Sequence, residues 1–212
     1  MTDNKTSLGF CEKLCIIWFI IDGMTHLTME AFYLYFAFGC TAKNSDSPWA
    51  FIWNEYSRAD SRWNVRDTNV MCLELITVCL FGPLCLLASF AVWSKKPWRH
   101  ALQLIICTAE LYGGWMTFGP EWIDGSPHLD GSDWILLWIY LVFMNGLWVV
   151  VPVVLLWDSI AQISFACDRS KTEILPRTAA HAAPSKGWFI FLAITILVYI
   201  ILIPLVLSTA KH

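Results

Sequence analysis

Residues Leu14–Phe38 read LCIIWFIIDGMTHLTMEAFYLYFAF, and this stretch decides what kind of protein the chain forms. A helix needs about 20 mostly apolar residues to cross the ~30 Å hydrocarbon core of a bilayer, and the stretch is long enough to do so. Its only acidic, basic or imidazole side chains are Asp22, His26 and Glu30. A soluble surface helix would instead carry a polar face along its whole length. The stretch therefore predicts a membrane-spanning helix.

Four further stretches of the chain match the same pattern. Of all residues, 57% are hydrophobic and 15% are charged, whereas soluble proteins average ~45–50% and ~25%. The 13 Trp residues suit membrane–water interfaces. We therefore predict an all-α membrane protein, a bundle of about five transmembrane helices. The further helices are expected at Asn69–Trp93, at Ala101–Phe118, which is the shortest, at Trp134–Trp157 and at Gly187–Leu207.

The segments between these helices predict the orientation of the chain. Cytoplasmic segments are enriched in Lys and Arg. Nine Lys and Arg residues fall in the N-terminal segment and the second and fourth links, against five in the first and third links and the C-terminal tail. The N-terminus is therefore expected in the cytoplasm and the C-terminus on the lumenal side. Because Met1–Gly9 is polar and the apolar run after it is long, we expect the first helix to be retained rather than cleaved as a signal peptide.

Composition and motifs exclude several classes of function. A net charge of −3 with no basic patch argues against nucleic-acid binding. The sequence has no nucleotide fingerprint, P-loop or serine nucleophile elbow, so no cofactor is expected. The eight cysteines form no CxxC pair and no Cys/His spacing typical of zinc, so no metal is expected either. We expect the cysteines of the apolar runs to be buried, chemically idle thiols: Cys15, Cys72, Cys79, Cys85 and Cys107.

The first helix carries the clearest chemical signal. Asp22, His26 and Glu30 follow one another at intervals of four residues, so they share one helix face. A charge at mid-bilayer costs ~2.5–3.5 kcal/mol, so such residues face a bundle interior. A histidine four residues before a glutamate can hold and pass a proton. The alternative is a cluster that only pairs with itself, but three ionisable groups exceed what packing needs.

Each of the next three helices adds two polar or aromatic side chains. Two of these pairs are one helical turn apart, and the pair in the third helix is followed by Gly113 and Gly114, which permit close backbone approach. A purely structural hydrogen bond remains the alternative for every pair, most strongly in the third helix. The pairs are Glu74 and Thr77, Glu110 and Tyr112, and Asn145 and Trp148.

Together these residues predict one kind of chemistry. The carboxyl groups can give and take protons, and the Trp148 ring offers a π face for a cation. Such a group suits protonation of an alkene, formation of a carbocation and removal of a proton elsewhere. This chemistry requires no cofactor.

The order of these motifs resembles the emopamil-binding protein family, the EXPERA-domain group that includes the sterol Δ8–Δ7 isomerases. The resemblance covers about 21–158, and residues 110–122 are most similar to the emopamil-binding-protein-like subfamily. The motifs are His26-Leu-Thr-Met-Glu30, Trp53-x-Glu55-Tyr56-x-x-x-Asp60-Ser61-Arg62, Glu74-x-x-Thr77 with Gly82-Pro83, Tyr112-Gly113, and Phe143-Met144-Asn145-Gly146-Leu147-Trp148 with Pro152.

The resemblance implies a helical bundle in the endoplasmic reticulum membrane that binds a sterol. It implies that His26 and Glu30 supply a proton, that Glu74 accepts or relays one, and that a loop closes over the substrate. The catalytic residues would be His26, Glu30, Glu74, Asn145 and Trp148, and the substrate-binding residues Asp22, Tyr56, Asp60, Arg62, Thr77, Glu110 and Tyr112.

The chain departs from the isomerases in organisation. Ala31 replaces a usual glycine, and the helix that precedes the His/Glu helix in the isomerases is not expected here. We expect an EXPERA-like core of four helices at 14–160, a cytoplasmic linker at 161–186 and an additional transmembrane helix at 187–208.

Three functions remain open from the sequence. The leading one is a sterol or terpenoid double-bond isomerase, the second an acid-initiated terpenoid cyclase or isomerase of specialised metabolism, and the third a non-catalytic sterol- or drug-binding membrane protein. The partners expected are the bilayer, a sterol or terpenoid substrate and cationic amphiphilic amines as inhibitors. Whether the chain forms a homodimer is left open.

Overall fold

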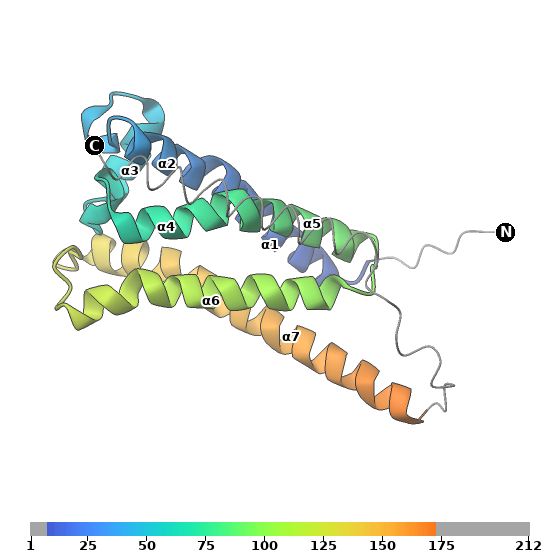
Figure 1. The fold of residues 1–212 in the computed structure, drawn as a ribbon. Helices are drawn as coiled ribbons and strands as arrows, with labels where there is room; N and C mark the ends of the chain where they lie inside the picture. The colour runs from blue at the N-terminus through green and yellow to red at the C-terminus, as the bar shows by residue number, and fades with distance from the viewer. Residues whose placement is uncertain (1–7, 173–212) are drawn as a thin grey trace. The chain divides into compact units, whose positions relative to one another are not determined.

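The computed structural model describes residues 8–172, and the regular structure in this range is helical, apart from one isolated β-bridge between Asp60 and Leu129 (Figure 1). The chain divides into two compact units, 1–163 and 164–212, and the site described below lies in the first. The all-α prediction is confirmed for the described residues. The additional helix expected at 187–208 lies outside them.

Four long helical rods contain most of the described residues. In three of them a wider π-helical segment interrupts or begins the α-helix, and such segments are frequent at functional sites. The first rod is α1 (Phe10–Met24), a π segment (Thr25–Glu30) and α2 (Ala31–Phe38); the second is α4 (Thr68–Ile76), a π segment (Thr77–Phe81) and α5 (Gly82–Trp93); the third is α6 (Arg99–Ile123); the fourth is a π segment (Ile135–Met144) and α7 (Asn145–Thr172).

Three rods are long and apolar enough to cross a membrane. They are Phe10–Phe38, Thr68–Trp93 and Ile135–Arg169. The rod α6 was expected to span at Ala101–Phe118, but it does not reach the same apolar standard, since it carries Gln103 and Glu110. Its 25 residues would still reach about 37 Å. Because α7 remains helical to Thr172, residues 161–172 of the expected linker are helical.

The rods α1 and α5 cross at a pair of glycines. A Cβ on Gly23 would lie 3.0 Å from the carbonyl oxygen of Gly82 and 3.1 Å from the Cβ of Cys85. A Cβ on Gly82 would lie 2.9 Å from Leu27 and 3.2 Å from the Cβ of His26. Only glycine allows this approach, and it brings the polar face of the first rod against the second.

Contacts at the two ends of the bundle agree with the expected grouping of the links. At one end Arg99, at the start of α6, forms an ion pair of 2.8 Å with Glu12 of α1. At the other end the first link contains the short α3 (Pro48–Tyr56), and Ser61 donates its backbone N–H to the carbonyl of His128 in the third link. The first and third links therefore lie at the same end.

Candidate active site

A chain of hydrogen bonds joins two of the π segments. The Nδ1 atom of His26 lies 2.6 Å from Oε2 of Glu30, and the hydroxyl of Thr77 donates to that same oxygen at 2.6 Å. The Thr77 oxygen also lies 3.1 Å from Oε2 of Glu74. A threonine hydroxyl has one proton to donate, so both contacts are hydrogen bonds only when a carboxyl group carries a proton. We call His26, Glu30, Thr77 and Glu74 the proton chain.

The proton chain is largely hidden from solvent. His26 is 3% exposed and Glu74 is 7% exposed, while the side chain of Glu30 keeps 13% of its surface open. Buried carboxyl groups are costly unless they are hydrogen-bonded. Of the two carboxyl groups in the proton chain, that of Glu30 is therefore the more accessible to a lipid-soluble molecule.

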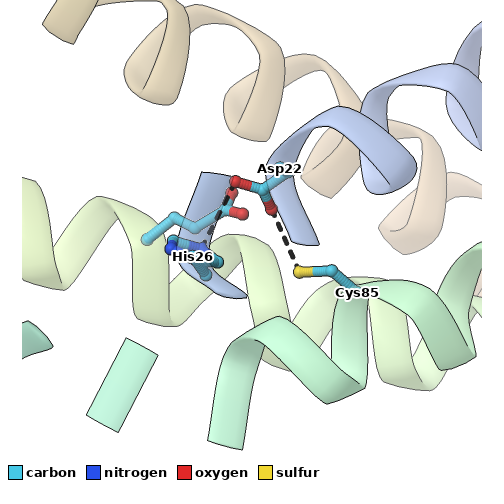
Figure 2. Close-up of side chains that lie close together, drawn as sticks. Asp22, His26 and Cys85 are labelled. Carbon is cyan, nitrogen blue, oxygen red and sulfur yellow. Dashed lines mark hydrogen bonds and ion pairs between the residues drawn. The ribbon is translucent and has the colours of Figure 1, made fainter. Parts of the chain in front are cut away.

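A second group of polar side chains continues from the other side of His26. Oδ1 of Asp22 lies 3.3 Å from His26 Nε2, and Oδ2 of Asp22 accepts a hydrogen bond of 3.0 Å from the Cys85 thiol (Figure 2). The carboxyl of Glu110 from α6 lies beside them. We call Asp22, His26, Cys85 and Glu110 the acid–thiol cluster.

The expected aromatic residue Trp148 adjoins this cluster. Its indole N–H donates to Oδ1 of Asp22 at 2.7 Å, and its ring lies 5.7 Å from the ring of Trp18, tilted by 58°. Trp148 therefore donates a hydrogen bond to Asp22 and also presents a π face. Trp18 was not predicted, although it lies four residues before Asp22 on the same helix.

Asn145 is joined to the first link. Its side-chain N–H groups contact the Tyr56 hydroxyl at 2.9 Å and the backbone carbonyls of Tyr140 and Leu141. Burial raises the pKa of Tyr56, which lies in α3, to about 12, despite the hydrogen bond from Asn145. The phenol therefore stays neutral at physiological pH. Asn145 and Tyr56 form a fixed pair between α7 and the link.

Asp60 and Arg62 bind each other rather than the proton chain. The guanidinium of Arg62 contacts Asp60 at 2.6 and 2.9 Å, the Thr117 carbonyl at 2.8 Å and Glu121 at 3.6 Å. Burial acts to lower the pKa of Arg62, but the hydrogen bonds and negative charge of Asp60 outweigh it, so the pKa is raised. Glu121 is in turn hydrogen-bonded to His128 of the third link. The contacts of Asp60, Arg62, Glu121 and His128 therefore anchor the first link to α6 and to the third link.

Tyr112 is not brought to either group. Its side chain is 64% exposed, while Glu110, two residues earlier, points into the cluster. Residues two apart on a helix do not face each other. Gly113 and Gly114 have open space where a Cβ would stand, so the close backbone approach that they permit is not made there by the described residues. It occurs at Gly23 instead.

The cysteine prediction holds for only part of the set. Cys85 and Cys107 are buried, whereas Cys15 is half-buried and Cys72 and Cys79 are exposed on the outside of their rod. The sequence missed the position of Cys85, a thiol that contacts a carboxylate. This contact depends on tertiary structure, because Cys85 reaches Asp22 only where α1 and α5 cross at glycines.

The chain is similar in sequence to a known family and to several characterised enzymes. The family model for EXPERA (expanded EBP superfamily) matches residues 48–159. The 3-beta-hydroxysteroid-Delta(8),Delta(7)-isomerase of Cavia porcellus is 33% identical over 168 residues, which cover 79% of this chain and 72% of the isomerase. Isomeliandiol synthase of Melia azedarach is 31% identical over 180 residues, 82% of this chain and 81% of the synthase. Protoglabretal synthase of Citrus sinensis is 33% identical over 158 residues, 74% of each chain.

Proposed function

We propose, from the premise that this chain belongs to the EXPERA (expanded EBP superfamily) family, that it is a membrane-embedded isomerase that moves a carbon–carbon double bond in a sterol. The observation that carries the proposal is the proton chain, in which two carboxyl groups and an imidazole are linked by hydrogen bonds of 2.6 to 3.1 Å. One protein group has to deliver a proton to the alkene and one has to remove a proton from a neighbouring carbon.

The reaction balances without any other reactant. A proton from the His26–Glu30 pair adds to C9 of a Δ8 sterol, and the positive charge develops on C8. Loss of a proton from C7 to a carboxylate then forms the Δ7 double bond. Glu74 is the natural acceptor, because Thr77 links it to Glu30 and lets the proton return for the next cycle. A positioned acid or base contributes roughly 10²- to 10⁴-fold to such a step.

The remaining site residues support this cycle in our proposal. Trp148 stabilises the cation, Asp22 and Glu110 border the acid pair, and Asn145 with Tyr56 fixes α7 to the first link. Asp60 and Arg62 hold that link in place. Protonated amphiphilic amines would inhibit, because a cation on an apolar body resembles the intermediate. Tyr112 faces outward and has no role in the cycle.

Expression in a yeast strain that lacks its sterol Δ8–Δ7 isomerase tests the function. Sterol profiling by mass spectrometry should show Δ8 sterols consumed and Δ7 sterols formed. The synthase names of the Melia and Citrus relatives favour a second candidate, an acid-initiated terpenoid cyclase or isomerase of specialised metabolism. Conversion of a terpenoid while Δ8 sterols accumulate would assign that candidate. Tight amine binding with neither conversion would assign a non-catalytic binding protein.

The membrane orientation is also a proposal. The distribution of Lys and Arg supports a cytoplasmic N-terminus and a lumenal C-terminus. The resemblance to the EXPERA family supports the endoplasmic reticulum as the location and a core at 14–160. A glycosylation acceptor in the Gly119–Asp133 link should be modified, and one after His212 should be modified if 187–208 spans. Modification of the second link instead would reverse the orientation.

A further inference from the structure

The acid–thiol cluster brings together, from three rods, four residues of the types that bind metals. Asp22 and His26 come from the first rod, Cys85 from α5 and Glu110 from α6. One ligand atom from each residue lies within 4.8 Å of all the others (Figure 2 shows three of the four labelled). Asp22, His26 and Cys85 are buried, and both oxygens of Glu110 are buried too.

The unpaired atoms in this cluster point independently to a ligand. Among the described residues, both carboxyl oxygens of Glu110 have no hydrogen-bond partner, and Nε2 of His26 has no hydrogen bond and only the ion-pair contact of 3.3 Å to Asp22. Buried polar atoms are rarely left in this state, because each lost partner costs about 1–3 kcal/mol. A cation between them would satisfy all three atoms.

The surroundings of His26 resemble those of a metal ligand. Its Nδ1 is held at 2.6 Å by Glu30, which leaves Nε2 directed toward Asp22. A histidine that binds a metal through one ring nitrogen almost always bonds a carboxylate or carbonyl through the other. Asp22 is oriented in the same way by the indole N–H of Trp148.

The ligand types select the metal. A thiol, an imidazole and two carboxyl groups suit zinc and similar first-row ions, whereas magnesium and calcium prefer oxygen alone. Zinc bonds of about 2.0–2.3 Å place tetrahedral ligand atoms roughly 3.3–3.8 Å apart. Atoms within 4.8 Å of each other need only small side-chain shifts to reach this spacing.

We propose that Asp22, His26, Cys85 and Glu110 bind one divalent zinc-class ion in the membrane-embedded core of the protein. Binding releases the Cys85 proton that now bonds Asp22, and the ion's charge offsets the anionic ligands. The inference goes beyond the proposed isomerisation and does not depend on it. His26 would belong to both groups, with Nε2 on the metal and Nδ1 on Glu30.

Cobalt binding by the full chain, purified in nanodiscs and stripped of metal, provides the test. One Co²⁺ per chain should give the visible absorption of tetrahedral cobalt and a thiolate-to-cobalt charge-transfer band, and Zn²⁺ should displace it. Cys85→Ser should abolish the charge-transfer band, while the matched variant Cys107→Ser should keep it, because Cys107 is buried but outside the cluster. Glu30→Gln should weaken binding roughly 10- to 100-fold and keep the band.

Glu110→Gln gives a second route if Cys85→Ser does not fold, and should lower the affinity for Co²⁺ without removing the charge-transfer band. A band that survives Cys85→Ser, or that disappears equally in Cys107→Ser, would overturn the assignment. So would the absence of stoichiometric binding by folded protein. Metal stoichiometry and sterol conversion are measured separately, so failure of one is not failure of the other.

Discussion

Two buried groups of charged side chains differ in how well their charges are matched. In the link, Arg62 is 2% exposed and Asp60 is fully buried, and the guanidinium contacts both oxygens of the carboxylate. In the bundle, one imidazole lies between the carboxyl groups of Asp22 and Glu30. Glu74 and Glu110 add two further acids.

The difference separates a structural role from a chemical one. A buried ion pair whose charges are matched and whose hydrogen bonds are all made has no proton that it can readily exchange. Four carboxyl groups around one imidazole can coexist only by sharing protons or by binding a cation, because unpaired buried charges are costly. The first group therefore holds the link in place, and the second is suited to moving protons. Substitutions in the link pair should therefore lower stability, whereas substitutions in the bundle group should lower turnover.

The largest expected effect follows removal of a proton-chain carboxyl. Glu30→Gln and Glu74→Gln keep the side-chain shape and remove the exchangeable acid, so each should lower sterol turnover by roughly 10²- to 10⁴-fold. The measurement is product formation by equal amounts of folded protein. Glu12→Gln is the control, since Glu12 pairs with Arg99 at the far end of α1. If Glu30→Gln or Glu74→Gln turns over sterol at nearly the wild-type rate, that residue is not part of the mechanism.

The next effect is on stability rather than on turnover. Arg62→Met leaves the Asp60 carboxylate buried without its partner, which should cost about 3–5 kcal/mol of unfolding free energy. Arg58→Met is the matched control, because Arg58 is 59% exposed and its pair with Glu55 is worth about 0–1 kcal/mol. Thermal unfolding in detergent measures both. Equal losses in the two variants would mean that Arg62 is no anchor.

A third effect concerns Trp148. A desolvated cation–π contact is worth about 2 kcal/mol, so Trp148→Leu should slow turnover about 30-fold. Trp148→Phe keeps the π face but loses the N–H that Asp22 accepts, so its loss should be smaller than that of the leucine variant. Trp157→Leu, on the same helix and 76% exposed, is the control. If amphiphilic amines bind Trp148→Leu as tightly as wild type, the ring does not face the cation.

The sequence predicts the features of this site that depend on a single helix. The spacing of Asp22, His26 and Glu30 identifies a polar face, and the structure places all three in contact, with a π-helical turn that the spacing alone does not reveal. The rods themselves follow from hydropathy. Predictions about single helices succeed because length and periodicity are local properties.

Contacts between rods are not predictable in this way. Cys85 and Glu110 meet Asp22 because Gly23 and Gly82 let two helices approach, and no periodicity reports that crossing. A transmembrane helix is apolar on all sides, so the sequence does not distinguish the lipid face from the core. For this reason Cys79 was wrongly expected to be buried.

The smallest expected effect is a pH dependence of the link anchor. Burial alone would raise the pKa of Glu121, but hydrogen bonds from His128 and the charge of Arg62 lower it below its ordinary value of 4.5. A carboxyl whose pKa is depressed on folding contributes stability above its unfolded pKa, and this stability is lost as the pH falls through the folded pKa. Acidification below about pH 4.5 should therefore weaken the contact between the third link and α6.

Glu121→Gln should remove this contribution and nothing else. At pH 7 the variant should unfold about 2–4 °C below wild type, which corresponds to about 1 kcal/mol in a chain of this size. The difference should shrink as the pH falls through the lowered pKa of Glu121, because the wild-type carboxyl then becomes protonated as well. Glu55→Gln is the control, since its pair with Arg58 is exposed. A difference that stays constant from pH 7 to pH 3 would show that Glu121 stabilises by packing, and the anchor would then rest on Asp60 and Arg62 alone.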